Sequence, residues 1–139
     1  MSSGWQQDWS LFVATLADCL RAGDTSEKLA QRFGGKEVTW QGVLDEKNID
    51  GLAPLVGITL PQKEIELGQG RSAILDGLSL PIAAHTIEQW SRLELGTPLT
   101  FTAILGPSGS LFAPIEVKIL RSGRTIVFIR LADAVPVRS

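Results

Sequence analysis

The stretch EVTWQGVLDEKN, residues 37–48, combines strict alternation with a tryptophan and a glycine, and it predicts a β-strand with one apolar face. Successive side chains of a β-strand point to opposite faces, so alternate residues form two groups. One group is apolar or small: Val38, Trp40, Gly42 and Leu44. The other holds Glu37, Thr39, Gln41 and Val43. We therefore predict that Trp40 is a core residue rather than an exposed platform for a ligand, filling space that Gly42 opens by letting the strand coil.

Two helices are predicted before this strand. In the first, residues 4–22, the apolar side chains recur at helical spacing and occupy one face: Trp5, Trp9, Phe12, Val13, Leu16 and Leu20. The second, TSEKLAQRF, follows a capping pair formed by Asp24 and Glu27 and ends at two glycines. Residues 1–35 are expected to be a helical extension that belongs to the same domain as the rest.

The remainder of the chain predicts further strands and one more helix. A loop, DEKNIDG, follows the first strand, and a turn, GQGR, joins the second strand to the third. Thr86 and Gln89 fit a capping box that opens a helix, HTIEQWSRLEL. The predicted strands lie within residues 52–67, 72–83, 99–105, 115–119 and 125–131.

The segment IEQWSRLELGTPLTFTAIL, residues 87–105, runs from a helix through Gly96 into an alternating strand. Together with VTWQGVL and the preceding FGGK, it resembles the oligonucleotide/oligosaccharide-binding (OB) fold, and it is similar to small bacterial tRNA-anticodon-like OB proteins, many of unknown role. The resemblance implies that residues 36–139 form a five- to six-stranded Greek-key barrel with a helix between strands three and four. It also implies ligand binding on strands two and three and on the loops L12 and L45.

Two features depart from this pattern. The N-terminal helical pair lies outside the barrel, and the last third holds three predicted strands where the OB fold needs two. The extra strand leaves open a different six-stranded barrel or an α+β sheet. The expected fold class is therefore mainly β with helices, as an OB-like barrel with an N-terminal extension.

Composition bounds the possible functions. A chain of 139 residues with 44% hydrophobic and 20% charged residues fits one globular domain. Its net charge of −2 offers no general attraction to nucleic acid or to an anionic membrane. Cys19 is the only cysteine, so no internal disulfide can form, and its apolar neighbours predict a buried thiol. The N-terminal apolar run is too short to span a bilayer and lacks the basic start of a signal peptide, so we expect a cytoplasmic protein without a membrane partner.

Residues for catalysis or metal binding are sparse. His85 is the only histidine, and no GxSxG elbow, HExxH motif or paired-cysteine spacing is present. EKNIDG matches the start of a calcium loop, but Gly57 stands where the bidentate glutamate is needed. Glu64 and Glu66 share a strand side and are interpreted as solvated carboxylates. We therefore predict no catalytic residue, no metal, no cofactor and a protein that is not an enzyme.

Two binding functions remain. The first is a binding or adaptor module for another protein, with the helix face of Trp5, Trp9 and Phe12 as contact patch if the barrel leaves it uncovered. Self-association through an edge strand is a related possibility. The second is single-stranded nucleic-acid binding through a small basic cluster: Lys118, Arg121, Arg124 and Arg130. We favour protein binding, because the predicted second and third strands lack aromatic residues and the loop DEKNIDG is acidic.

Overall fold

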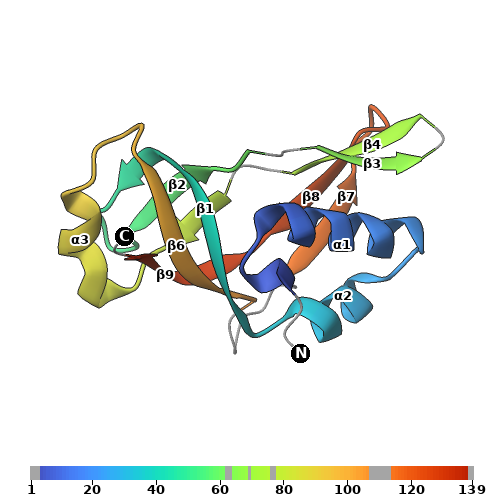
Figure 1. Cartoon of the computed structure of the whole chain (residues 1–139). Coiled ribbons are helices and arrows are strands. Elements are labelled where there is room, and N and C mark those ends of the chain that lie inside the picture. Colours follow the sequence, from blue (N-terminus) through green and yellow to red (C-terminus); the bar gives the residue numbers. More distant parts are fainter. Residues whose placement is uncertain (1–3, 62–63, 69, 76–77, 107–113, 138–139) are drawn as a thin grey trace.

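The computed structural model describes residues 4–61, 64–68, 70–75, 78–106 and 114–137 (Figure 1). Within these residues the protein is mainly β, with nine strands in two sheets and three α-helices. Figure 1 shows the first sheet at one end of the molecule together with α3 (Ile87–Ser91). The second sheet lies at the other end, beside α1 (Trp9–Arg21) and α2 (Ser26–Phe33).

The first predicted helix is divided near its start. A 3₁₀ turn, Gly4–Gln6, comes first, and α1 begins only at Trp9. Asp8 is the cause, because its extended backbone and its carboxylate cap α1 by accepting a hydrogen bond from the Ser10 N–H at 2.9 Å. The prediction of one continuous helix over residues 4–22 is therefore wrong at its N-terminal end.

The second helix is confirmed, but its cap is one residue later than predicted. Thr25 has extended backbone, and its hydroxyl accepts a hydrogen bond from the Lys28 N–H at 3.3 Å. The predicted capping pair of Asp24 and Glu27 is thus wrong, because Thr25 already satisfies the first turn. Gly35, with φ at +77°, follows the helix and donates its N–H to β6.

The first sheet has five strands in the order β5-β2-β1-β6-β9. These strands are β1 (Lys36–Asn48), β2 (Leu55–Thr59), β5 (Leu78–Pro81), β6 (Pro98–Leu105) and β9 (Leu131–Val137). The hydrogen-bonded pairs are antiparallel, and β1 lies at the centre. The two edges approach each other, since an isolated parallel bridge pairs Ile82 with Ala134 and the Ala83 N–H donates to the Ala134 carbonyl at 3.2 Å.

The second sheet is built from two hairpins that the chain inserts between strands of the first. Its order is β3-β4-β8-β7, with β3 (Glu64–Gly68), β4 (Arg71–Leu75), β7 (Ile115–Ile119) and β8 (Thr125–Ile129). The hairpins join through β4 and β8, which run parallel. α1 packs against β3 and α2 packs against β7, so both N-terminal helices contact the second sheet.

The structure has more strands than the sequence predicted. Residues 52–67 and 72–83 each contain two strands, and the C-terminal third contains four strands because 131–137 forms β9. β8, in the predicted strand 125–131, is an inner strand of the second sheet, because it lies between β4 and β7. The predicted loop 45–51 begins later, since β1 continues to Asn48.

A mainly β fold with helices is therefore confirmed, while the five- to six-stranded barrel is not. The hydrogen-bonded order of the first sheet ends at β5 and β9, and no closed barrel is found among the described residues. The isolated bridge between Ile82 and Ala134 and the hydrogen bond from Ala83 to Ala134 link these two edges.

The third helix is shorter than predicted and has a different start. A 3₁₀ turn, Ala84–Thr86, leads into α3. The predicted capping box of Thr86 and Gln89 is wrong, because Thr86 is buried and its hydroxyl donates to the carbonyl three residues earlier at 2.6 Å. Trp90 is buried, and its Nε1 donates to the Ala134 carbonyl at 3.2 Å. This bond fixes α3 against β9.

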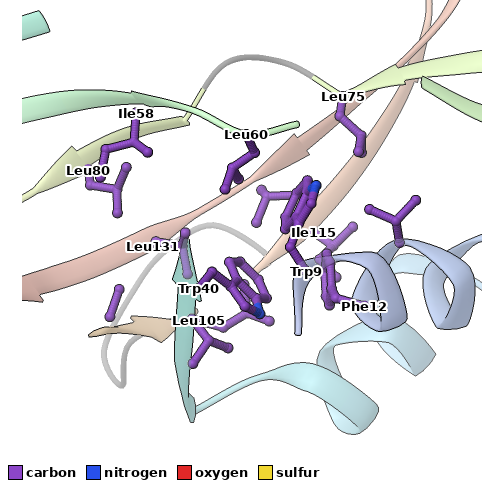
Figure 2. Packing of buried hydrophobic residues seen from close by; sticks show 14 of the residues in the cluster. Trp9, Phe12, Trp40, Ile58, Leu60, Leu75, Leu80, Leu105, Ile115 and Leu131 are labelled. Carbon is purple, nitrogen blue, oxygen red and sulfur yellow. The ribbon is translucent and has the colours of Figure 1, made fainter. Parts of the chain in front are cut away.

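Trp40 lies in the core, as the alternation predicted, with 1% of its surface exposed. In Figure 2 it points from β1 toward α1 and lies near Phe12 and Leu105. Gly42, on the same side of β1, is required by close packing: a Cβ there would lie 2.6 Å from Cγ2 of Ile58 and 2.8 Å from the Thr59 carbonyl oxygen. The glycine thus lets β1 and β2 approach closely.

Candidate functional site

The apolar face of the N-terminal helices is covered. Trp5 and Trp9 are each 5% exposed and Phe12 is 0% exposed. Their rings form one cluster with those of Trp40 and Phe33, with centroid separations of 4.8 to 5.7 Å. The condition for a contact patch on this face, that the rest of the domain leave it uncovered, is not met. These aromatic residues pack the N-terminal segment onto β1.

The structure places the four predicted basic residues on one hairpin, β7–β8. Lys118, Arg121 and Arg124 are exposed, whereas Arg130 is half-buried beyond the end of β8. Glu116 of β7 lies among them. Its carboxylate is 3.3 Å from Nη2 of Arg130 and 3.9 Å from Nζ of Lys118. The cluster is therefore partly neutralised by its own strand.

The second sheet has one face in the core and one outside it, which we call the outer face. Ile74 of β4 and Ile126 of β8 are register partners there, and Phe128 follows on β8. All three are half-buried. None of them belongs to the core cluster or to the partly buried residues packed against it. The outer face therefore has an apolar centre that the described part of the protein does not bury in its core.

Charged side chains of both signs surround this centre. The strand registers place Glu64 opposite Ile74, Lys118 opposite Ile126 and Glu116 opposite Phe128. Nζ of Lys118 lies 5.5 Å from the centroid of the Phe128 ring, within the range of a cation–π contact. Among the described residues, Glu66 of β3 also lies on this face, and Arg130 joins it through its ion pair with Glu116; Arg124 is exposed just before β8.

Sequence reasoning missed the apolar centre although a signal for it exists. In the run RTIVFIR, residues 124–130, the strand positions 125–129 are mostly apolar on both sides, and this pattern indicates a central strand without indicating an apolar outer face. Its alternate positions 126 and 128 lie between arginines 124 and 130, and they form the outer-face group. Which side of a doubly apolar strand meets the core is not specified by the strand's own pattern.

Two clefts lie on the described part of the molecule, and the first of them borders the outer face at Glu64 and Glu66. One, of about 740 Å³, lies between α1 and the β3–β4 hairpin and is lined by both small and charged residues, among them Ala14, Asp18 and Glu64. The other, of about 630 Å³, lies between α3 and the ends of β6 and β9, and its lining includes Leu93 and Leu99. Neither contains a histidine or a cysteine in its lining.

The residues considered for catalysis or metal binding are not brought together. His85 is exposed in the 3₁₀ turn before α3, and Glu64 and Glu66 are exposed on β3. Within the described residues, no group of three or more histidine, cysteine or acidic side chains could hold a metal ion. Cys19 is buried, as predicted, and burial raises the pKa of its thiol.

No protein-family model matches this chain, and no curated protein matches it. Among the helices of the described residues, none combines the length and the apolar character needed to cross a membrane.

Proposed function

We propose that the protein is a non-enzymatic binding module whose ligand is another protein, contacted through the outer face of the second sheet. One observation carries the proposal: Ile74, Ile126 and Phe128 form an apolar row outside the core. Apolar side chains that a domain does not bury in its own core are a common mark of an interaction surface. The contact surface thus differs from the helix face considered first.

The chemistry of this face favours a protein ligand. Its centre is aliphatic and aromatic, and its rim carries Glu64 and Glu66 as well as Lys118 and Arg124. An apolar centre inside a polar rim of mixed sign is typical of protein–protein interfaces. A phosphate backbone would instead favour a rim of one sign.

We also propose that the first sheet is an OB-like barrel. Strands β1, β2, β5, β6 and β9 take the roles of barrel strands one to five, and α3 lies between the third and the fourth. The bridge from Ile82 to Ala134 would then be the parallel closure between strands three and five. In this scheme the β7–β8 hairpin belongs to the loop between strands four and five. The resemblance implies a role in ligand binding for that loop, which supports the outer face as the binding surface.

Single-stranded nucleic acid is the second candidate ligand. Phe128 offers a ring beside Lys118, and Arg121 and Arg124 are exposed on the same hairpin. A ring for base stacking combined with nearby cations is what such ligands require. The two ion pairs of Glu116 and the carboxylates of β3 weaken this candidate, because they reduce the attraction for phosphate.

Site-specific photo-crosslinking would test the protein ligand. p-Benzoylphenylalanine replaces Phe128 in the full chain, and cells that produce it are irradiated before denaturing purification. We expect discrete adducts between this chain and another protein, and we expect them to disappear when Ile126→Glu is added. The matched control carries the probe at Leu95, which is 59% exposed and lies after α3, and should give none of these adducts.

Fluorescence anisotropy with a labelled oligothymidylate would decide between the two ligands. We expect no salt-sensitive binding at low ionic strength. If the wild type binds and the double variant Lys118→Glu/Arg124→Glu does not, nucleic acid is the ligand and the proposal of a protein ligand is wrong. Absence of crosslinked partners at position 128 would also contradict the proposal.

A further inference from the structure

We propose that the protein forms a symmetric dimer in which β7 of one copy pairs antiparallel with β7 of a second copy. β7 is an edge strand of the second sheet. In its ladder with β8, the N–H of Leu120 donates to the Arg124 carbonyl and the N–H of Arg130 to the Pro114 carbonyl. The even-numbered residues of β7 therefore face β8, so those with odd numbers direct their backbone groups to the open edge. That edge is a template for another strand.

The opposite edge of the same sheet is already occupied. Arg21 at the end of α1 donates from Nε and Nη2 to the Glu66 carbonyl of β3, at 3.1 and 2.8 Å. α1 itself packs along β3. At β7, α2 is the neighbouring helix, and its end reaches the start of the strand, where Gly34 lies beside Pro114. Among the described residues, the end of β7 at Ile119 is the open one.

The sequence of β7, IEVKI, is complementary to itself when two copies run antiparallel about Val117. In that register Val117 meets its own copy, and Ile115 of each chain meets Ile119 of the other. All three are odd-numbered residues, so each pair would exchange backbone hydrogen bonds. The register would fall on a two-fold axis, as most dimer interfaces do.

The charged residues of β7 fit the same register. Glu116 of each copy would lie opposite Lys118 of the other at the positions without backbone bonds, where side chains approach most closely. Both lie on the outer face, and a two-fold axis perpendicular to the sheet keeps the outer faces of the two copies on one side. A shift by one or two residues would lose these two ion pairs. Opposite charges therefore select this register over its neighbours.

The pairing would also cover exposed apolar surface. Ile119 is 75% exposed, although it ends a strand whose first inward residue, Ile115, is 0% exposed. In the dimer, Ile119 would lie beside Ile115 of the second copy and near the end of its α2. The two four-stranded sheets would become one continuous sheet. This dimer needs no other partner, because both strands come from this chain.

Sedimentation velocity and light scattering of the purified full chain test the dimer. We expect twice the 15.0 kDa mass of the chain at high concentration, with dissociation on dilution. Glu116→Lys alone and Lys118→Glu alone should each weaken dimerisation at least tenfold, because each places like charges opposite one another. The double variant should restore it, since the swapped charges pair again. Circular dichroism verifies that each variant is folded.

A second variant tests the pairing of the two β7 strands without changing Glu116 or Lys118. Ile119→Lys places an inward charge on the edge strand and should leave a folded monomer at every concentration. The matched control, Leu95→Lys, changes another exposed aliphatic residue away from β7 and should keep the mass of the dimer. A wild-type chain that stays monomeric overturns the proposal. Failure of the double charge swap to restore a dimer lost in the single variants overturns the register.

Discussion

Nε1 of Trp40 donates a hydrogen bond to the backbone carbonyl of Trp5 at 3.0 Å, and both groups are buried. The two residues are 35 positions apart, so the bond ties the N-terminal segment to the central strand of the first sheet. A buried carbonyl needs such a partner, because leaving it unsatisfied in the interior is costly. The helical extension is thereby part of the core.

Replacing Trp40 by phenylalanine should therefore loosen the N-terminal segment. A smaller aromatic ring remains, but the Trp5 carbonyl loses its donor, which alone costs about 1–3 kcal/mol of unfolding free energy. Urea unfolding measures the loss, and hydrogen exchange should show faster exchange in residues 4–7. Trp90→Phe is the control, because its Nε1 bonds to Ala134 instead. It should destabilise the domain without faster exchange at 4–7, and the same N-terminal pattern in both variants would contradict the prediction.

Gly42→Ala should destabilise the domain although it adds only one methyl group. The new Cβ would lie 2.6 Å from Cγ2 of Ile58 and 2.8 Å from the Thr59 carbonyl oxygen, so β1 and β2 must separate. Overpacking of this kind costs about 1–3 kcal/mol. Gly51→Ala is the matched control, because nothing lies within 4 Å of its added Cβ, and it should change stability by less than about 0.5 kcal/mol. Equal urea midpoints for the two variants would exclude close packing at Gly42.

The buried thiol predicts a loss of stability at alkaline pH. Burial raises the pKa of Cys19 in the folded protein, so the unfolded chain loses this proton first as the pH rises. The unfolding free energy contributed by this group is complete below the ordinary thiol pKa of about 8.5 and decreases above it. Urea unfolding from neutral to alkaline pH should therefore show a steeper decline for the wild type than for Cys19→Ala. Parallel declines would contradict a raised pKa.

The sequence predicts the buried residues most accurately for a strand that has one buried face and one exposed face. The alternation from Val38 to Leu44 places Trp40 and Gly42 correctly, because a one-residue shift would expose the whole apolar group. The helical periodicity around Trp9 and Phe12 likewise predicts a buried face. It does not specify what covers that face, so a core and a partner-binding surface look alike in the sequence.

The second sheet shows why the remaining fold was not predicted. The segments 52–67 and 72–83 each contribute one strand to each sheet. The pattern of apolar residues in these segments does not specify which sheet a strand joins. The outer-face residues Ile126 and Phe128 were missed for a related reason, since both sides of β8 are apolar. Pairing between distant hairpins, here β4 with β8, is decided by tertiary packing rather than by local pattern.

Arg21 should stabilise the β3–β4 hairpin more than the rest of the domain. Its guanidinium donates twice to the Glu66 carbonyl on the edge of β3 that α1 covers, and it also pairs with Asp18 at 3.2 Å. Because the side chain is partly exposed, we expect Arg21→Ala to cost only about 1 kcal/mol overall. Hydrogen exchange should instead show a local increase in the amides of β3 and β4, since that edge loses its cover. Arg92→Ala removes a guanidinium whose pair with Glu88 is exposed and distant in sequence from the hairpin, so it should leave exchange in the hairpin unchanged. Unchanged exchange in the Arg21 variant would mean that α1 holds β3 by apolar packing alone.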